Sequence, residues 1–222
     1  AYLERGHERA LRPGLTGAEA DRLWSAGTTD VWGTAPNFVV HPPGGKWMIA
    51  LGELLFGTTS PWGWRFASAV AGTLSILLIG RIARRLFGST LLGTTAALLL
   101  AMDGQHFVHS RIGLLDVFVM FWALAAFGCL LIDRDQARDR TLAGGRRSVR
   151  WWRVAAGLCL GLCISTKWSG LFFAAAFSIA SVLWDVAARR AAAGSRRRLR
   201  RPPSRLPRPR PAMKAATIRA ME

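Results

Sequence analysis

Residues 112–132 read IGLLDVFVMFWALAAFGCLLI, an apolar run of 21 residues in which Asp116 is the only charged residue. A helix that crosses a lipid bilayer needs about 20 consecutive apolar residues. The apolar positions cover every face of a helix and do not alternate as in a half-buried strand, so the run is unlike the surface elements of a soluble domain. It predicts a helix that lies within a membrane.

Four further apolar runs lie on either side of this one, at residues 64–80, 86–102, 151–166 and 168–184. Backbone polar groups find no water in the hydrocarbon layer, so only helices and closed β-barrels span it. The runs lack the alternation of barrel strands. With 51% hydrophobic residues gathered in such blocks, the sequence predicts an all-α, multi-span helical membrane protein with about five helices over residues 64–184. It excludes an ordinary soluble globular domain.

The net charge of +17 would ordinarily indicate a nucleic-acid partner. The excess is concentrated, however, because residues 189–222 hold 12 basic residues and one acidic residue. We therefore expect no nucleic-acid partner. Residues 185–222 are predicted to form a basic, disordered cytoplasmic tail. Binding to anionic membrane lipid, a purely solvated state and a frame-shifted read of a GC-rich gene are the open interpretations of this tail.

The distribution of Lys and Arg predicts how the chain is oriented in the membrane. Segments 81–85 and 133–153 contain three and seven basic residues, and with five spans both fall on the same side as the tail. Loops rich in Lys and Arg stay in the cytoplasm. We therefore expect a multi-pass protein of the cell membrane with residues 1–63 extracytoplasmic and the C-terminal tail cytoplasmic. Because the number of spans is odd, we also expect a further span upstream of residue 1.

Within residues 1–63, the segment 46–56 (KWMIALGELLF) predicts a short amphipathic helix. Trp47, Leu51 and Leu54 recur at helical spacing and share one face. A helix of this length is too short to cross the roughly 30 Å of hydrocarbon. We expect it to lie in the membrane interface.

Polar residues inside or beside the apolar runs indicate a functional site, because charged groups are costly in lipid. The candidates on the predicted outer side are His41, Arg65, His106, Arg111, Asp116 and Lys167. The three basic residues among them have a second interpretation as interfacial anchors that reach the head groups. Asp116 is too short for that role and needs a partner. Arg111 lies roughly 140° away around a helix, so Arg65 or Lys167 is expected to pair with Asp116.

The His and Cys residues do not predict a metal site or a cofactor. His106 and His109 are three residues apart, but Asp103 is the only further candidate ligand beside them. The three cysteines lie inside apolar runs and lack the spacing of a zinc site or a disulfide framework. We expect neither a metal nor a cofactor.

Five short motifs occur in a fixed order along the chain. They are His41-Pro42-Pro43 followed by Lys46-Trp47, then Trp64-Arg65-Phe66, Ser110–Asp116, Lys167-Trp168-Ser169-Gly170 and Leu183-Trp184-Asp185. With these motifs and its hydropathy, the chain from about residue 1 to 190 resembles the N-terminal half of the protein O-mannosyltransferases. Within that family it resembles specifically the bacterial polyprenyl-phosphate-mannose–protein mannosyltransferases. The resemblance implies part of a C-type membrane glycosyltransferase fold, with one more span upstream and several downstream.

The resemblance also implies a reaction. Mannose passes, with inversion, from polyprenyl-phosphate-mannose to a Ser or Thr hydroxyl of a secreted protein, outside the membrane, and the protein export machinery is an implied partner. Such a reaction needs a general base for the hydroxyl and positive charge for the leaving phosphate. The arginine of the family's Trp-Arg-Phe motif corresponds to Arg65, so Arg65, Lys167 and Arg111 are expected to bind the donor phosphate. His41, in the family's His-Pro-Pro turn, is expected to support the site together with Asp116 and His106.

The family's general base belongs to an Asp-Glu pair just ahead of an Ala-Tyr type segment. This chain begins at Ala1-Tyr2, so the resemblance places the pair upstream, and Glu4 and Glu8 do not match it. The catalytic residue is therefore unknown within these 222 residues, and we expect the chain alone to be an incomplete, inactive fragment. The alternatives are a related lipid-phosphate-sugar transferase with a non-protein acceptor and a non-enzymatic membrane bundle, such as part of a transporter.

Overall fold

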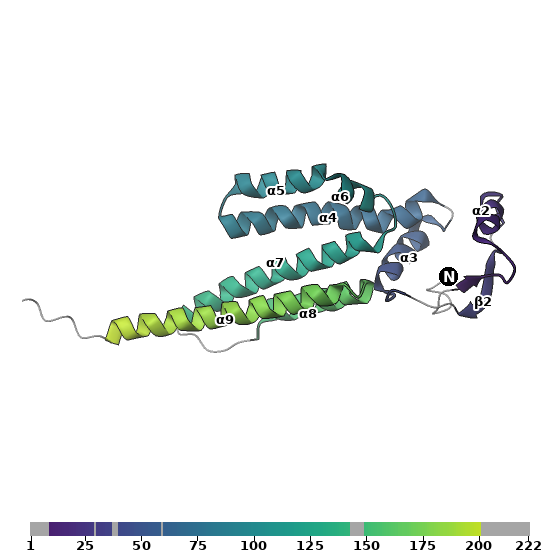
Figure 1. Cartoon of the computed structure of the whole chain (residues 1–222). Helices are drawn as coiled ribbons and strands as arrows, with labels where there is room; N and C mark the ends of the chain where they lie inside the picture. The colour runs from purple at the N-terminus through teal and green to yellow at the C-terminus, as the bar shows by residue number, and fades with distance from the viewer. Residues whose placement is uncertain (1–8, 29, 37–39, 59, 143–148, 201–222) are drawn as a thin grey trace, which may run out of the picture.

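The computed structural model describes residues 9–28, 30–36, 40–58, 60–142 and 149–200 (Figure 1). The described chain is almost entirely helical, which confirms the all-α fold class. Its helices are α2 (Gly17–Ser25), α3 (Gly44–Phe56), α4 (Pro61–Phe87), α5 (Thr90–Met102), α6 (Gly104–His109), α7 (Leu115–Leu142), α8 (Trp151–Thr166) and α9 (Gly170–Arg200). Two short strands, β1 (Arg9–Leu11) and β2 (Trp32–Pro36), pair antiparallel in the N-terminal region.

Among the residues that the structure describes, three helices contain segments that are long and apolar enough to cross a membrane. These segments are Pro61–Phe87 in α4, Leu115–Arg140 in α7 and Gly170–Gly194 in α9. Helix α5 has 13 residues and α8 has 16. At 1.5 Å per residue they extend about 20 Å and 24 Å, less than the roughly 30 Å of a hydrocarbon core. That five helices cross the membrane therefore stays a prediction.

The boundary between the first two predicted helices lies later in the chain than the sequence indicated. Helix α4 continues to Phe87, and Gly88 ends it with a left-handed backbone (φ 63°) that favours glycine. The side chain of Ser89 then caps α5 by accepting a hydrogen bond from the backbone N–H of Leu92. The residues around 86 thus belong to α4, and α5 is correspondingly short.

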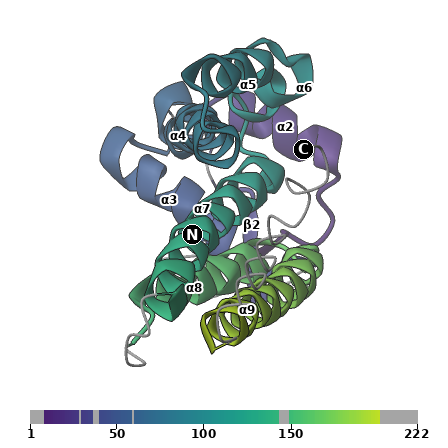
Figure 2. The same cartoon turned by 90° about the vertical axis from the view of Figure 1, so that its left-hand side faces the viewer.

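Helix α7 lies at the centre of the bundle. Viewed along the bundle, α4 and α5 lie on one side of it and α8 and α9 on the other (Figure 2). On the first side Val117 and Phe118 pack against Ala71 of α4. On the second side Val119 and Ala123 pack against Cys163 of α8. Burial on both sides explains why the sequence of α7 is apolar around its whole circumference.

Close helix approach depends on small residues. A Cβ atom at Gly93 of α5 would lie 2.8 Å from the carbonyl oxygen of Gly80 in α4. Only a residue without a side chain fits at this distance, so Gly80 and Gly93 together let α5 pack closely along α4.

Helix α9 continues well past the predicted start of the tail. The sequence predicted disorder from Asp185 onward, whereas the helix continues to Arg200. The segment between them is rich in alanine, the best helix former, and its arginines lie toward the C-terminal end, where positive charge favours a helix. Residues 201–222 of the predicted tail, residues 143–148 of the basic loop, and Ala1 and Tyr2 lie outside the described residues.

Candidate functional site

The candidate residues gather at one end of the bundle, which we call the α3 end. Here α3 lies beside the start of α4, the start of α7 and the end of α8 (Figure 1). Asp116 is in the first turn of α7, and Lys167 directly follows α8. The opposite end, where residues 81–85, 133–135 and 150–153 lie, is the Arg-rich end.

Lys167 and Asp116 form an ion pair across the bundle. The ammonium Nζ of Lys167 donates a hydrogen bond of 2.8 Å to Oδ1 of Asp116. Of the two partners expected for Asp116, Arg65 and Lys167, the structure pairs it with Lys167. A tight turn between α8 and α9 places Lys167, because a Cβ atom at Gly170 would lie 2.6 Å from the backbone nitrogen of Ile164. The side chains remain 28% and 45% exposed, so a ligand can reach the pair.

The His41-Pro42-Pro43 turn is held at the same corner by the two glycines after it. A Cβ atom at Gly45 would lie 2.6 Å from the side chain of Leu115 in α7 and 2.8 Å from that of Thr166 in α8. The carbonyl oxygen of His41 accepts a hydrogen bond of 3.4 Å from Lys46. The turn is therefore packed against the two helix ends that carry Asp116 and Lys167.

Arg65 and Arg111 lie at the start of α4 and in the loop before α7, and both are exposed. The guanidinium group of Arg65 stacks over the Trp64 ring at 4.4 Å, and that of Arg111 over the Phe107 ring at 4.9 Å. Within the described part of the chain, neither forms a hydrogen bond or ion pair with a carboxylate. Their positive charges are thus available to an anionic ligand.

His106 differs from the other candidates because it is buried. Its side chain is 5% exposed, and neither ring nitrogen has a hydrogen-bond partner among the described residues. Asp103 was the further candidate metal ligand beside the two histidines. Its side chain instead caps α6 by accepting hydrogen bonds from the backbone N–H groups of Gln105 and His106. His106 therefore faces the packed interior between α6 and the bundle, and a supporting role for it stays a prediction.

No group of three His, Cys, Asp or Glu side chains within the described ranges is arranged to hold a metal ion. His109 is partly exposed whereas His106 is buried, so the two imidazoles face different surroundings. In the described part of the α3 end, an anionic ligand would therefore be bound by positively charged side chains and not through a metal ion.

The Arg-rich end contains an ion-pair network that the sequence analysis missed. Arg150 and Arg153 of the α8 start both donate to Asp133 of α7 and to Asp185 of α9. Burial by itself would lower the pKa of Arg150, but the hydrogen bonds to the two carboxylates outweigh it and raise the pKa above its usual value. The signal was present in the sequence, since the four residues all lie at ends of apolar runs on one predicted side.

Comparison with protein-family models gives a match over most of the chain. Residues 31–195 match the family model described as dolichyl-phosphate-mannose-protein mannosyltransferase. This chain belongs to that family. The match includes the His41 turn, Arg65, Asp116 and Lys167, so the whole α3 end described above falls within the matched residues.

Several curated proteins are similar to the chain. The polyprenol-phosphate-mannose–protein mannosyltransferase of Mycolicibacterium smegmatis is 49% identical over 164 residues, which cover 68% of this chain and 32% of that protein. The protein of the same name from Mycobacterium tuberculosis is 48% identical over 164 residues, which cover 68% of this chain and 31% of that protein. The undecaprenyl phosphate-alpha-4-amino-4-deoxy-L-arabinose arabinosyl transferase of Pseudomonas aeruginosa is 36% identical over 126 residues. These residues cover 57% of this chain and 22% of that protein. The chain thus spans about a third of the length of its mannosyltransferase relatives. No solved structure matches it.

Proposed function

We propose that this protein transfers mannose from polyprenyl-phosphate-mannose to Ser or Thr hydroxyls of secreted proteins, with the donor phosphate bound at the α3 end. The observation that supports this most strongly is the family match over residues 31–195. The names of the mycobacterial relatives, which state a polyprenol-phosphate-mannose donor and a protein acceptor, support it further. The α3 end is extracytoplasmic in this proposal, and acceptors reach it as they leave the export machinery.

The charges of the α3 end suit the leaving group of this reaction. The acceptor hydroxyl oxygen attacks the anomeric carbon of mannose, the bond from that carbon to the phosphate oxygen breaks, and the lipid phosphate leaves with the electron pair. The hydroxyl proton passes to a general base, which we do not assign to a residue of this chain. Arg65 and Arg111 present guanidinium groups whose paired N–H donors match phosphate oxygens. They stabilise the charge that develops on the phosphate.

Lys167 and Asp116 have a different part in the proposal. Because Asp116 accepts the hydrogen bond of Lys167 at 2.8 Å, it holds the ammonium group in a defined place. Lys167 then directs its remaining ammonium N–H donors toward the phosphate at little cost in side-chain entropy. His41 supports this corner through the packed turn, and His106 supports the wall formed by α6.

The depth of the site agrees with a lipid-linked donor. Arg65 lies in the first turns of α4, where a candidate membrane span begins, with Trp62 and Trp64 beside it. Tryptophan is enriched at head-group depth. A polyprenyl phosphate keeps its tail in the hydrocarbon, so its phosphate must lie at that same depth.

Arg65 provides the test. The protein is expressed from its complete gene in a host without its own protein mannosylation, and membranes are assayed with labelled polyprenyl-phosphate-mannose and a Ser/Thr peptide. Arg65→Ala is expected to lower kcat by roughly a hundredfold, the scale for loss of one charge-stabilising contact. Arg65→Lys should recover part of this, because an ammonium group cannot donate in a fork. Arg138→Ala, which removes an exposed arginine at the opposite end, is the matched control and should leave the rate unchanged.

Two outcomes would contradict the proposal. Full activity of Arg65→Lys at equal membrane abundance would show that Arg65 is only an interfacial anchor, for which length and charge suffice. Absence of transfer by the unsubstituted protein, with transfer from a lipid-phosphate aminoarabinose donor in its place, would favour the second candidate. The 36% identity to the Pseudomonas arabinosyl transferase is the observation that makes this second donor worth including.

A further inference from the structure

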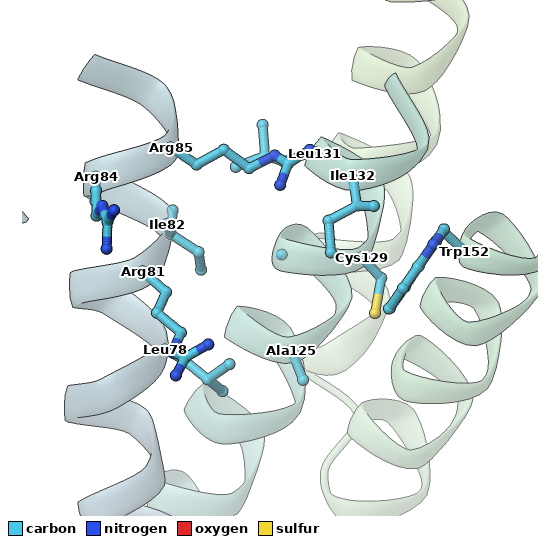
Figure 3. Close-up of a pocket in the computed structure, with 11 residues that line it drawn as sticks. Leu78, Arg81, Ile82, Arg84, Arg85, Ala125, Cys129, Leu131, Ile132 and Trp152 are labelled. Carbon is cyan, nitrogen blue, oxygen red and sulfur yellow. The ribbon is translucent and has the colours of Figure 1, made fainter. Parts of the chain in front are cut away.

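A cavity of about 520 Å³ lies between α4, α7 and the start of α8, close to the Arg-rich end and away from the candidate residues of the α3 end (Figure 3). Its apolar walls are formed by Leu78, Ile82, Ala125, Gly128, Leu131, Ile132 and Trp152. The volume is within the roughly 300–1,000 Å³ of pockets that hold small molecules. The cavity is therefore large enough for a lipid segment.

Three arginines of α4 line the same cavity. Arg85 is neutralised, because its Nε donates a hydrogen bond of 2.8 Å to Asp135 of α7. Arg81 and Arg84 form no hydrogen bond or ion pair with another described side chain. Figure 3 shows Arg81 and Arg85 reaching from α4 toward α7. The apolar cavity thus has two positive charges at its rim without a counter-charge from the described part of the protein, Arg81 on the side toward α7 and Arg84 on the side of α4 that faces α5.

The cavity has a direction relative to the membrane. Arg85 lies near the end of the candidate span of α4, and Ile132 directly precedes the charged residues Asp133 and Arg134 of α7, whereas Leu78 and Ala125 lie about two turns further in. Seven residues of helix extend roughly 10 Å. Trp152, at the start of α8, belongs at head-group depth. The arginines therefore lie toward the head groups and the apolar part extends into the hydrocarbon.

We propose that this cavity binds an anionic phospholipid, with the phosphate at Arg81 and Arg84 and one acyl chain along Leu78, Ala125 and Leu131. Charged residues near lipid require an opposite charge or water. Basic pockets between membrane helices at the cytoplasmic side are suited to anionic head groups. The site lies at the opposite end of the bundle from the proposed donor site, so it is distinct from the donor and does not depend on the proposed mannosyl transfer.

The test measures lipid bound to the purified chain by native mass spectrometry in detergent. The probes are dioleoyl-phosphatidylglycerol and dioleoyl-phosphatidylcholine, which share acyl chains and differ in net charge. Phosphatidylglycerol should bind in preference. The double variant Arg81→Gln with Arg84→Gln should reduce phosphatidylglycerol binding by roughly 25-fold, at about fivefold for each arginine. The control Arg189→Gln with Arg190→Gln removes two exposed arginines of α9 and should leave binding unchanged.

A second variant tests the apolar part. Ala125→Phe adds a ring inside the cavity without changing charge, and it should reduce phosphatidylglycerol binding while helix content by circular dichroism stays the same. If the double arginine variant does not fold, the proposal is tested by Ala125→Phe and by the two variants Arg81→Lys and Arg84→Lys. The lysine variants keep the positive charge and should keep most of the phosphatidylglycerol binding.

Four results would overturn the proposal. Equal binding of the two lipids would show that charge does not select the occupant. Equal loss in the α9 control would show general attraction to a basic protein. Unchanged binding in both cavity variants would show that the lipid binds elsewhere, as expected if a protein segment covers the cavity. Full competition by inorganic phosphate would likewise exclude a role for the acyl chain.

Discussion

The two ends of the helix bundle hold their charges in different ways. At the α3 end, Lys167 donates one hydrogen bond to Asp116, and the Asp116 side chain is 45% exposed. At the Arg-rich end, Asp133 is 3% exposed and accepts from both Arg150 and Arg153. One end thus has an accessible pair and the other has a closed network.

The difference follows from how many helices contribute. Arg150 and Arg153 at the start of α8 connect Asp133 on α7 to Asp185 on α9, so the network joins three helices. Removal of one partner from a buried network leaves a desolvated charge and is strongly destabilising. An exposed pair contributes about 0–1 kcal/mol. We infer that the Arg-rich end holds the bundle together, which leaves the α3 end free to bind a ligand.

The largest expected effect concerns the membrane side of the two ends. Thr28→Cys, near the α3 end, should be labelled in intact cells by a thiol reagent that cannot cross the membrane. Ser148→Cys, in the basic loop, should be labelled only after permeabilisation, because loops rich in Lys and Arg stay inside. The native cysteines, which lie in the helices α7 and α8, provide the background measured in the unsubstituted chain. Labelling of Ser148→Cys in intact cells would show that the orientation in the membrane is the opposite of the predicted one.

The next effect concerns the network. Asp133→Asn should lower the free energy of unfolding by about 3 kcal/mol or more, because Arg150 and Arg153 lose a buried carboxylate. Reversible denaturation in mixed micelles measures this. Arg150→Gln together with Asp133→Asn should cost less than the sum of the single changes, since the pair acts as one unit. Strict additivity would show that the two residues do not interact.

The smallest stability effect is expected at the α3 end. Asp116→Asn should change the free energy of unfolding by no more than about 1 kcal/mol, because the pair is partly exposed. Its effect on mannose transfer should be larger, roughly ten- to a hundredfold, since Lys167 loses the contact that positions it. The comparison of the two ends fails if Asp116→Asn destabilises the protein as much as Asp133→Asn does.

Much of the site could be anticipated from sequence, and the reason is that its parts are local. The Trp-Arg-Phe motif and the His-Pro-Pro turn are contiguous, and each is recognisable without knowledge of the fold. The pairing of Asp116 with Lys167 was accessible through helix geometry, which excluded Arg111 and left two partners. The burial of His106 could not be predicted from the sequence, because it depends on how α6 packs against α4. Nothing in a six-residue helix indicates which of its faces is covered.

The sequence by itself determined that the chain is helical and belongs in a membrane, because the length and apolar content of a run are local properties that decide its solvent. Only the tertiary structure decided which charges meet. Asp133 and Arg150 lie 17 residues apart, and Arg150 and Asp185 lie 35 apart. Whether such side chains meet depends on the rotation and register of neighbouring helices. Small residues such as Gly80 and Gly93 set these by the closeness of approach that they permit, and no single segment contains that information.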